Sequence, residues 1–292
     1  METKHFFHYA TKGLEDDVLF GSRKSFIAGM NRIGLCLIKA RESSPILIFS
    51  FCLMDNHVHF ILYGFKENCD SFMALYKRLT EIWLAKHPEE GAPGKKWEIG
   101  HWIIKDEESL IEKIVYVHRN PVAARMPYVP GGYEWSSARL MFSSNEGVLS
   151  YGTKVSNISL NKQRILFGSK ISVPGDWIVL PDGMIWPGCY TDYKRAERYF
   201  TSVVNYQFEL NRHCEDAVNR EMLDDHVSLP DNDIKEAARV VSKEMFNTEC
   251  ISSLDLDKRL RLAKELRKRT GSSTKQISRI VRIRLSDLRE LI

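Results

Sequence analysis

The sequence predicts an α+β protein built from several sections. Two runs rich in β-branched and aromatic residues, at 46–51 and 57–63, are typical of β-strands. Apolar residues at helical spacing follow at 71–86, and residues 251–292 repeat that spacing with a strong positive charge. Strands and helices in one early section, followed by a helical end, favour the α+β class.

Composition narrows the class of protein. The chain has 292 residues, of which 43% are hydrophobic and 27% charged, as in folded proteins that stay in water. It contains no apolar run long enough for a membrane span and no apolar segment behind a basic N-terminus. We therefore expect a cytoplasmic protein with no membrane partner. The six cysteines form no CxxC pair, which argues against a zinc ribbon or a disulfide framework.

The first section, residues 1–145, is predicted to hold the sheet. The segment 54–56 between the two strands is either a turn or a bulge in one long strand. Helices are expected at 22–40, 71–86 and 107–119. Asp106 is a plausible N-cap for the last of these, and Pro121 is expected to end it at Asn120.

The second section, residues 146–250, contains no constellation of catalytic residues. Residues 177–180 and 184–186 flank Pro181-Asp182-Gly183, which predicts a β-hairpin. Helical spacing is seen at 191–212 and 233–246. This section is expected to be a mixed α/β segment.

The third section, residues 251–292, is predicted to be a basic helix-turn-helix-like module that binds DNA. From Lys258 onward, twelve Lys or Arg residues stand against three acids, so this end carries about +9 while the whole chain carries +4. A helix at 255–269 is broken at Gly271 and followed by helices at 274–281 and 287–292, with Ser273 and Ser286 as caps. The inward positions are expected to be Leu256, Leu260, Ala263 and Leu266 in the first helix, and Ile277, Ile280 and Val281 in the second.

Two small motifs carry the chemistry. His57 and His59 are two residues apart on a predicted strand, so both imidazoles point to one face and can bind one metal ion. Half-buried histidines with ordinary hydrogen bonds are the alternative. Tyr116 and Asn120 are four residues apart on a predicted helix and share a face, nearly opposite the apolar stripe that includes Ile114.

These motifs resemble those of the HUH single-tyrosine transposases. The stretch Phe51-Cys-Leu-Met-Asp-Asn-His-Val-His-Phe-Ile-Leu is similar to the family's strand with two histidines around one hydrophobic residue. Tyr116-Val-His-Arg-Asn-Pro-Val-Ala-Ala is similar to its catalytic-tyrosine helix. Phe7-His-Tyr-Ala-Thr-Lys-Gly-Leu resembles its first strand, and Glu134-Trp-Ser-Ser-Ala its closing element.

The similarity covers residues 5–142 and is greatest to the REP-associated tyrosine transposases, related to the insertion-sequence 200 type. Two positions depart from the family pattern: Asp55 stands in place of the usual proline, and Lys12 in place of the common arginine.

The resemblance implies a ferredoxin-like or RRM-like antiparallel sheet with the histidines on an inner strand. It implies a metal-dependent endonuclease that cuts single-stranded DNA, in hairpins above all, and takes part in transposition and DNA recombination. Tyr116 is the implied nucleophile, which forms a 5′-phosphotyrosine. His57, His59 and Asn120 are the implied ligands of Mg²⁺ or Mn²⁺. His118 lies on another face of the helix and is not assigned as the base.

DNA contacts are expected from basic and aromatic residues outside the site. A homodimer is one option for the oligomeric state. Two other functions stay open: a domesticated regulator that binds DNA hairpins without cutting, and an RRM-like RNA-binding protein. The candidate DNA-binding residues are Lys77, Arg78, Lys95, Lys96, Trp97, Lys275, Arg279 and Arg282.

Overall fold

The chain forms two compact units in the computed structural model, and each is described by itself. The first unit joins residues 1–120 to residues 130–211, and the second joins residues 121–129 to residues 212–292. No helix in the described part of the chain is long and apolar enough to cross a membrane. The structure describes residues 3–12, 18–42, 45–90, 97–124, 126, 129–144, 146–211, 231–272, 274–284 and 287–288.

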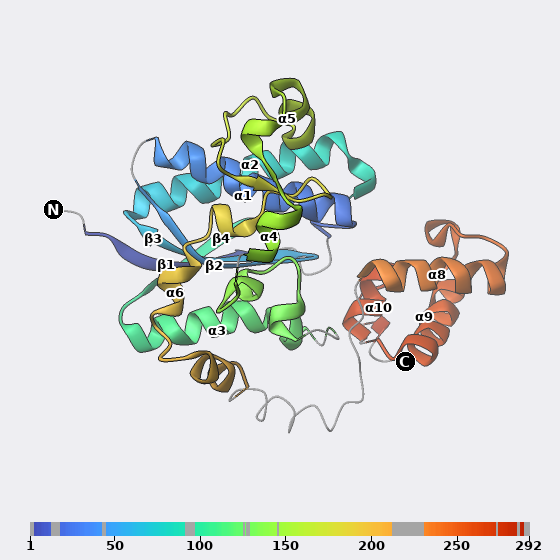
Figure 1. Cartoon of the computed structure of the whole chain (residues 1–292). Coiled ribbons are helices and arrows are strands. Elements are labelled where there is room, and N and C mark those ends of the chain that lie inside the picture. The colour runs from blue at the N-terminus through green and yellow to red at the C-terminus, as the bar shows by residue number, and fades with distance from the viewer. Residues whose placement is uncertain are drawn as a thin grey trace. The chain divides into compact units, whose positions relative to one another are not determined.

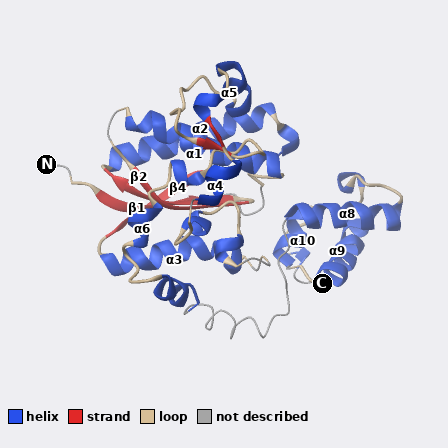
Figure 2. Ribbon diagram, viewed as in Figure 1, coloured by secondary structure: helices blue, strands red, loops and turns tan. Residues whose placement is uncertain are grey.

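A four-stranded antiparallel sheet organises the first unit (Figure 2). Its strands are β1 (His5–Lys12), β2 (Leu47–Met54), β3 (His57–Gly64) and β4 (Glu98–Ile104), in the order β2-β3-β1-β4. One long helix connects β1 to β2 and another connects β3 to β4, which is the split βαβ arrangement of ferredoxin-like sheets. The predicted position of the histidine strand inside the sheet is confirmed, because β3 lies between β2 and β1.

A tight hairpin sets the register of the histidine strand. Met54 pairs with His57, so Asp55 and Asn56 form a turn and not a bulge. The backbone carbonyl of Asp55 accepts hydrogen bonds from the amides of Leu19 and Phe20, at 2.7 and 2.9 Å. The turn that contains Asp55 is therefore fixed by backbone hydrogen bonds from another segment of the chain.

Helices α1 (Arg23–Arg41) and α2 (Lys66–Lys86) cover one face of the sheet (Figure 1). The buried ring of Phe60 on β3 contacts the rings of Phe72 and Tyr76 on α2, with centroids 5.7 and 5.4 Å apart. Helix α2 begins before the predicted residue 71. The apolar spacing did not indicate its first turn, because that turn is mostly polar.

Helix α3 (Glu107–Ala123) lies on the opposite face (Figure 1). Asp106 caps it as predicted, since its Oδ1 accepts from the amide of Ser109 at 2.8 Å. The predicted end at Asn120 is wrong, because the helix continues through Pro121. A proline at this position cannot donate to the carbonyl of Val117. That carbonyl instead lies 3.5 Å from the donating Nδ2 of Asn120, so the helix tolerates the proline.

Residues 130–211 pack with the sheet, so the predicted division at residue 145 is not a boundary between compact units. The predicted hairpin is confirmed: Trp186 donates to the carbonyl of Ile178 at 2.8 Å around a turn in which Gly183 has φ +90°. The predicted helix at 191–212 is wrong as one piece, because it is interrupted between residues 197 and 203. The elements here are α4 (Glu146–Tyr151), β5 (Thr153–Lys154), α5 (Leu160–Phe167), β6 (Ile178–Val179), α6 (Tyr193–Glu197) and a helical segment at 203–211.

The outer edge of β2 is closed by two later segments. Ser136 forms a β-bridge with Cys52, and the amide of Leu53 donates to the carbonyl of Trp135 at 2.9 Å. Farther along the strand, the amide of Asp192 donates to the carbonyl of Ile48 at 2.7 Å. The Trp-Ser-Ser element thus satisfies backbone groups that an edge strand would otherwise expose.

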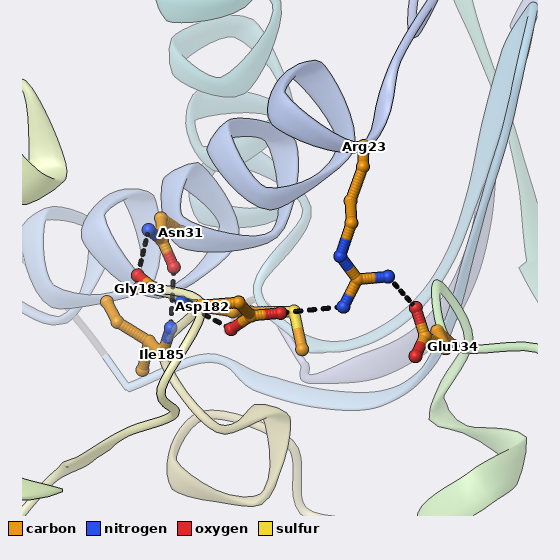
Figure 3. Close-up of polar contacts among 7 residues, drawn as sticks. Arg23, Asn31, Glu134, Asp182, Gly183 and Ile185 are labelled. Carbon is orange, nitrogen blue, oxygen red and sulfur yellow. Dashed lines mark hydrogen bonds and ion pairs between the residues drawn. The ribbon is translucent and has the colours of Figure 1, made fainter.

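Polar side chains fasten α1 to the hairpin at residues 182–185 (Figure 3). The buried amide of Asn31 donates to the carbonyl of Gly183 at 3.0 Å and accepts from the amide of Ile185 at 2.6 Å. Arg23 pairs with Glu134 and with Asp182. Both Nδ2 and Oδ1 of Asn31 therefore form hydrogen bonds with the hairpin.

The second unit is helical, and its described core joins three helices. These are α8 (Asp231–Phe246), α9 (Leu256–Thr270) and α10 (Thr274–Val281). Helix α8 shares that core, so this unit begins before the predicted residue 251. Asp255 caps α9, and Gly271 ends it with φ +63°. Leu256 was expected to point inward, but it is 62% exposed, and the neighbouring Leu254 is buried in its place.

The three inward positions of α10, Ile277, Ile280 and Val281, are confirmed as buried. Residues 287 and 288 are helical as expected, whereas the caps Ser273 and Ser286 and the rest of that helix lie outside the described residues.

Replacing Asn31 with alanine is expected to destabilise the first unit by about 1–3 kcal/mol, because it leaves a buried amide and carbonyl without partners. Urea unfolding followed by tryptophan fluorescence measures this, since all six tryptophans belong to the first unit. The control is Asn161→Ala on an exposed turn of α5, expected to change stability by less than about 0.5 kcal/mol. Equal effects for the two variants would contradict the role of Asn31.

Candidate metal and tyrosine site

His57 and His59 lie side by side on β3, on the sheet face that α3 covers. Their ring centroids are 5.0 Å apart and their planes are nearly perpendicular. Val58 and Phe60 alternate with them and are fully buried on the other face. The predicted pairing of the two imidazoles on one face is confirmed.

Tyr116 on α3 reaches the same place. Its ring centroid lies 5.4 Å from that of His59 and 5.7 Å from that of His8. Tyr116 is 48% exposed, so it is open to solvent and not enclosed in the core. The histidines and the tyrosine therefore meet within one chain.

Asn120 is held next to His57. Its Nδ2 donates to the backbone carbonyl of Tyr116 at 3.0 Å, which turns its Oδ1 toward the sheet. That Oδ1 lies 3.2 Å from Nε2 of His57. As predicted, Asn120 joins the site one helical turn after Tyr116, although its side chain is buried and that of Tyr116 is not.

Each ring nitrogen of His57 lies within hydrogen-bond distance of a side-chain amide oxygen. Its Nδ1 lies 2.7 Å from Oδ1 of Asn56, and its Nε2 lies 3.2 Å from Oδ1 of Asn120. A neutral ring has one N–H, so it donates to only one of these oxygens at a time. When Nδ1 carries the proton, Nε2 has the lone pair that a cation binds, beside the Oδ1 of Asn120. This donor set fits a divalent cation.

His59 is kept neutral. Burial, followed by repulsion from His57 and His8, holds the pKa of His59 well below its usual value, and a hydrogen bond with Asn120 opposes this only in part. A neutral imidazole is the form that binds metal. Among the described residues no three His, Cys, Asp or Glu side chains gather into a metal cluster, so the trio depends on the amide oxygen of Asn120.

His8 is a member of the site that the sequence analysis missed. Its Nε2 lies 3.0 Å from Nδ1 of His59, and the two rings stack with centroids 5.2 Å apart. Burial, with a smaller contribution from Lys113, lowers the pKa of His8 to about 4. A neutral His8 can accept the Nδ1 proton of His59, which directs Nε2 of His59 away from it. The pairing of β1 with β3 was the missing signal.

Trp102 continues this stack toward solvent. Its ring lies 5.4 Å from that of His8 at an angle of 28°, and its side chain is 45% exposed. The ammonium of Lys113 lies 5.6 Å from the centre of the Tyr116 ring. An accessible aromatic ring therefore lies against His8, and a cation lies over the ring of Tyr116.

His118 has a structural role, in agreement with its exclusion as the base. It is fully buried, with Nε2 2.9 Å from Oγ of Ser137 and Nδ1 2.8 Å from the hydroxyl of Tyr206. Burial lowers its pKa to about 3. Ser137 also accepts from the amide of Phe51 on β2 at 2.9 Å. These contacts, which we call the His118 latch, fasten α3 to β2 and to the segment 203–211.

The predicted DNA-binding residues differ in how exposed their side chains are. Trp97 is a correction: it is 1% exposed and cannot stack on a base as it stands, and Lys77 lies over its ring at 5.4 Å and donates to its carbonyl. Arg78 and Arg282 are exposed, and Arg279 is partly buried. Lys95, Lys96 and the side chain of Lys275 lie outside the described residues.

Comparisons with known proteins give one likeness. No protein-family model and no curated protein matches the chain. A solved structure described as a REP-associated tyrosine transposase bound to a REP hairpin is similar with a TM-score of 0.31 and 13% identity, over 47% of this chain and 79% of that one. A likeness at this level carries no functional argument, so the function rests on the geometry of the site.

Replacing Tyr206 with phenylalanine is expected to lower stability by about 1–2 kcal/mol, because it removes the buried hydroxyl that meets Nδ1 of His118. Thermal unfolding of the first unit measures the change. Tyr151→Phe, at a tyrosine that is 53% exposed, serves as the control and is expected to be neutral. A neutral Tyr206→Phe would show that the His118 latch contributes nothing to stability.

Proposed function

We propose that the protein is a metal-dependent, single-tyrosine transposase-type nuclease that cuts and rejoins single-stranded DNA. The observation that carries the proposal is the meeting of Tyr116 with His59 on one sheet face, ring centroids 5.4 Å apart, beside Nε2 of His57 and Oδ1 of Asn120, which lie 3.2 Å apart. A nucleophile next to a cation-binding trio is the arrangement that phosphoryl transfer needs.

The metal ligands proposed are His57, His59 and Asn120. Two imidazole nitrogens and one amide oxygen suit Mn²⁺ well and are compatible with Mg²⁺. A bound divalent ion supplies Lewis-acid polarisation of the scissile phosphate and offsets charge in the transition state. His8 holds the ring of His59 through its Nδ1, which makes it a positioning residue.

Tyr116 is the proposed nucleophile. Its phenol oxygen forms a bond to the scissile phosphorus, while the bond from that phosphorus to the 3′ oxygen breaks. The phenol loses its proton and the leaving 3′ oxygen gains one, which gives a 5′-phosphotyrosine and a free 3′-hydroxyl. The new ester keeps the energy of the broken phosphodiester, so another 3′-hydroxyl can reverse the step without ATP.

Two neighbours assist the tyrosine. The ammonium of Lys113 lies 5.6 Å from its ring centre, where it can meet a phosphate oxygen of the bound strand. The exposed ring of Trp102 offers a surface on which an unpaired base next to the scissile phosphate can stack. The stacking surface of Trp102 favours a single strand over a duplex, whose bases are already stacked.

The second unit is proposed to bind the duplex part of a hairpin. In this proposal the twelve Lys or Arg residues from Lys258 onward supply phosphate contacts, and α9 and α10, which follow each other around Gly271, serve as a helix-turn-helix. Action in the cytoplasm, as a monomer or a homodimer, belongs to the same proposal.

The RNA-binding alternative is disfavoured by the sheet. An RRM-like protein presents aromatic residues on an open sheet face. Here the ring of Phe60 packs on α2, while that of His59 meets α3, so helices cover both faces at the histidine strand. The non-cutting hairpin binder shares all of these features and is separated only by an assay of cleavage.

Tyr116→Phe is expected to abolish a covalent protein–DNA adduct that the wild-type protein forms with a labelled single-stranded hairpin in Mg²⁺ or Mn²⁺. Denaturing gels detect the adduct. Tyr151→Phe is the matched control and is expected to form the adduct normally. Hairpin binding by the wild-type protein without any adduct would favour the non-cutting regulator, and an adduct in Tyr116→Phe would exclude Tyr116 as the nucleophile.

Asn120→Leu is expected to weaken Mn²⁺ binding by at least about tenfold, because it removes one of three ligands without changing the side-chain volume much. His8→Phe keeps a stacked ring and is expected to weaken Mn²⁺ binding by roughly tenfold or more, since it removes the acceptor for Nδ1 of His59. Titration of Mn²⁺ followed by electron paramagnetic resonance measures both, with unfolding curves as controls for folding. Unchanged affinity in both variants, or adduct formation in excess EDTA, would refute the metal site.

A further inference from the structure

Helix α9 (Figure 1) carries seven Lys or Arg residues, and their contacts separate them into two groups. Four of the seven are engaged within the second unit, in ion pairs with acids or in hydrogen bonds with neighbouring oxygens. These four are Lys258, Arg259, Arg267 and Arg269, and their partners are Asp255, the carbonyls of Ser252 and Leu254, Oγ1 of Thr274, and the acids Glu244 and Glu265.

The other three, Arg261, Lys264 and Lys268, are exposed and form no ion pair within the described part of the chain. They are spaced by three and by four residues, so they share one face of the helix. That face is opposite the one on which Leu262 and Leu266 are buried in the core of the unit. We call these three residues the α9 stripe.

The acids near the α9 stripe do not neutralise it. Asp257 lies on the same face, but in the first turn, before the stripe begins. Glu265 lies beside the stripe, and its Oε1 accepts from Nε of Arg269 at 2.7 Å. Three exposed cations therefore follow one another on this face of α9.

The length of the α9 stripe fits a strand of duplex DNA. Seven residues of α-helix rise about 10 Å, and one strand of a duplex carries a phosphate about every 3.4 Å along its axis. The stripe thus has three cations over a length that holds about three phosphates. A membrane surface fits less well, because a membrane-binding helix inserts its apolar face, and that of α9 is buried in the core.

Helix α10 offers less surface to DNA than α9. In a helix-turn-helix the second helix ordinarily enters the major groove. Here at least five of the eight residues of α10 are buried, and none of the side chains described there is exposed. The Nε of Arg279 is also covered from solvent. The first helix of the pair is therefore the one with an open cationic face.

We propose that the α9 stripe binds the phosphates of one strand in the duplex stem of a DNA hairpin, without reading the bases, while α10 stays in the core of the unit. The choice of DNA as the partner rests on the proposed function. The stripe is a positioning surface: it holds the stem, and the chemistry belongs to the first unit.

The test measures binding of the full chain to a labelled DNA duplex without single-stranded ends, by fluorescence anisotropy at several salt concentrations. The stripe variant is Arg261→Gln/Lys264→Gln/Lys268→Gln. Its slope of log K against log salt is expected to fall by about 2 to 3, because three phosphate contacts are lost. Affinity at about 0.1 M salt is expected to fall by at least about tenfold, and equally for two unrelated duplex sequences, since phosphates carry no sequence information.

The matched control removes the same charge from the same unit, at three cations that already pair with acids. Its slope is expected to change by less than about 1, because these cations contact no phosphate. Far-UV circular dichroism verifies that the helices of every variant are intact. The control variant is Arg239→Gln/Lys243→Gln/Lys258→Gln, whose residues pair with Glu236, Glu249 and Asp255.

A charge-keeping variant, Arg261→Lys/Lys264→Arg/Lys268→Arg, separates the role of charge from that of folding. It is expected to bind the duplex like the wild type, because a phosphate contact needs a cation and not one particular side chain. Loss of duplex binding in this variant as well would contradict the proposal.

Adduct formation on a single strand without a stem keeps this test apart from that of the nuclease. The stripe variant is expected to form that adduct as the wild type does, since Tyr116 lies in the other unit. A wild type that binds duplex but forms no adduct would refute the nuclease and leave the stripe supported. The stripe proposal is overturned if the wild type does not bind the DNA duplex, if it prefers an RNA duplex of the same sequence, or if the stripe and control variants lose affinity equally.

Discussion

The alternation of side chains along one inner strand is the constraint on which this molecule depends. On β3, His57 and His59 face α3, while Val58 and Phe60 are buried toward α1 and α2. A slip of one residue would exchange the two sets, placing imidazoles in the apolar core and removing them from Tyr116. The register is fixed on both sides, by the hairpin pair of Met54 with His57 and by the pairing of Ala10 with His59.

The second requirement is that α3, which carries Tyr116, keep a fixed position along and around its axis relative to β3. Packing of apolar residues alone allows a helix to rotate or slide, whereas the His118 latch ties α3 to Ser137 and Tyr206 through directed hydrogen bonds. Ser137 in turn bonds to Phe51, one strand away from the histidines. Residues beyond the sheet therefore help to position Tyr116. The segment 203–211 takes part through Tyr206, although no sequence motif in that segment indicated this role.

The sequence predicted what local periodicity controls. The two histidines, the shared face of Tyr116 and Asn120, and the buried face of α10 all follow from repeats of two or of about 3.6 residues. What it missed depends on contacts distant in sequence. His8 joins the site because β1 pairs with β3, and Trp97 is buried at a place where Lys77, twenty residues away in sequence, lies over its ring. The passage of α3 through Pro121 required a side chain, Asn120, to compensate a carbonyl. Helix α8 does not carry the strong positive charge of α9 and α10. The prediction from composition therefore left α8 out of the C-terminal section, although α8 shares its core.

Folded chains satisfy nearly all buried polar groups, and the exceptions therefore carry information. At the tyrosine site the polar atoms have partners: Nε2 of His57 lies 3.2 Å from Oδ1 of Asn120, and Nε2 of His8 lies 3.0 Å from Nδ1 of His59. Two neighbouring residues of α1, on the other side of the sheet, differ from each other. Both polar atoms of the Asn31 amide bond to the hairpin at 183–185, whereas both terminal nitrogens of Arg32 are buried and make no hydrogen bond. Asn31 therefore fastens α1 to the hairpin through directed bonds, while Arg32 is held by its Nε bond to Thr80 and by the ring of Trp83.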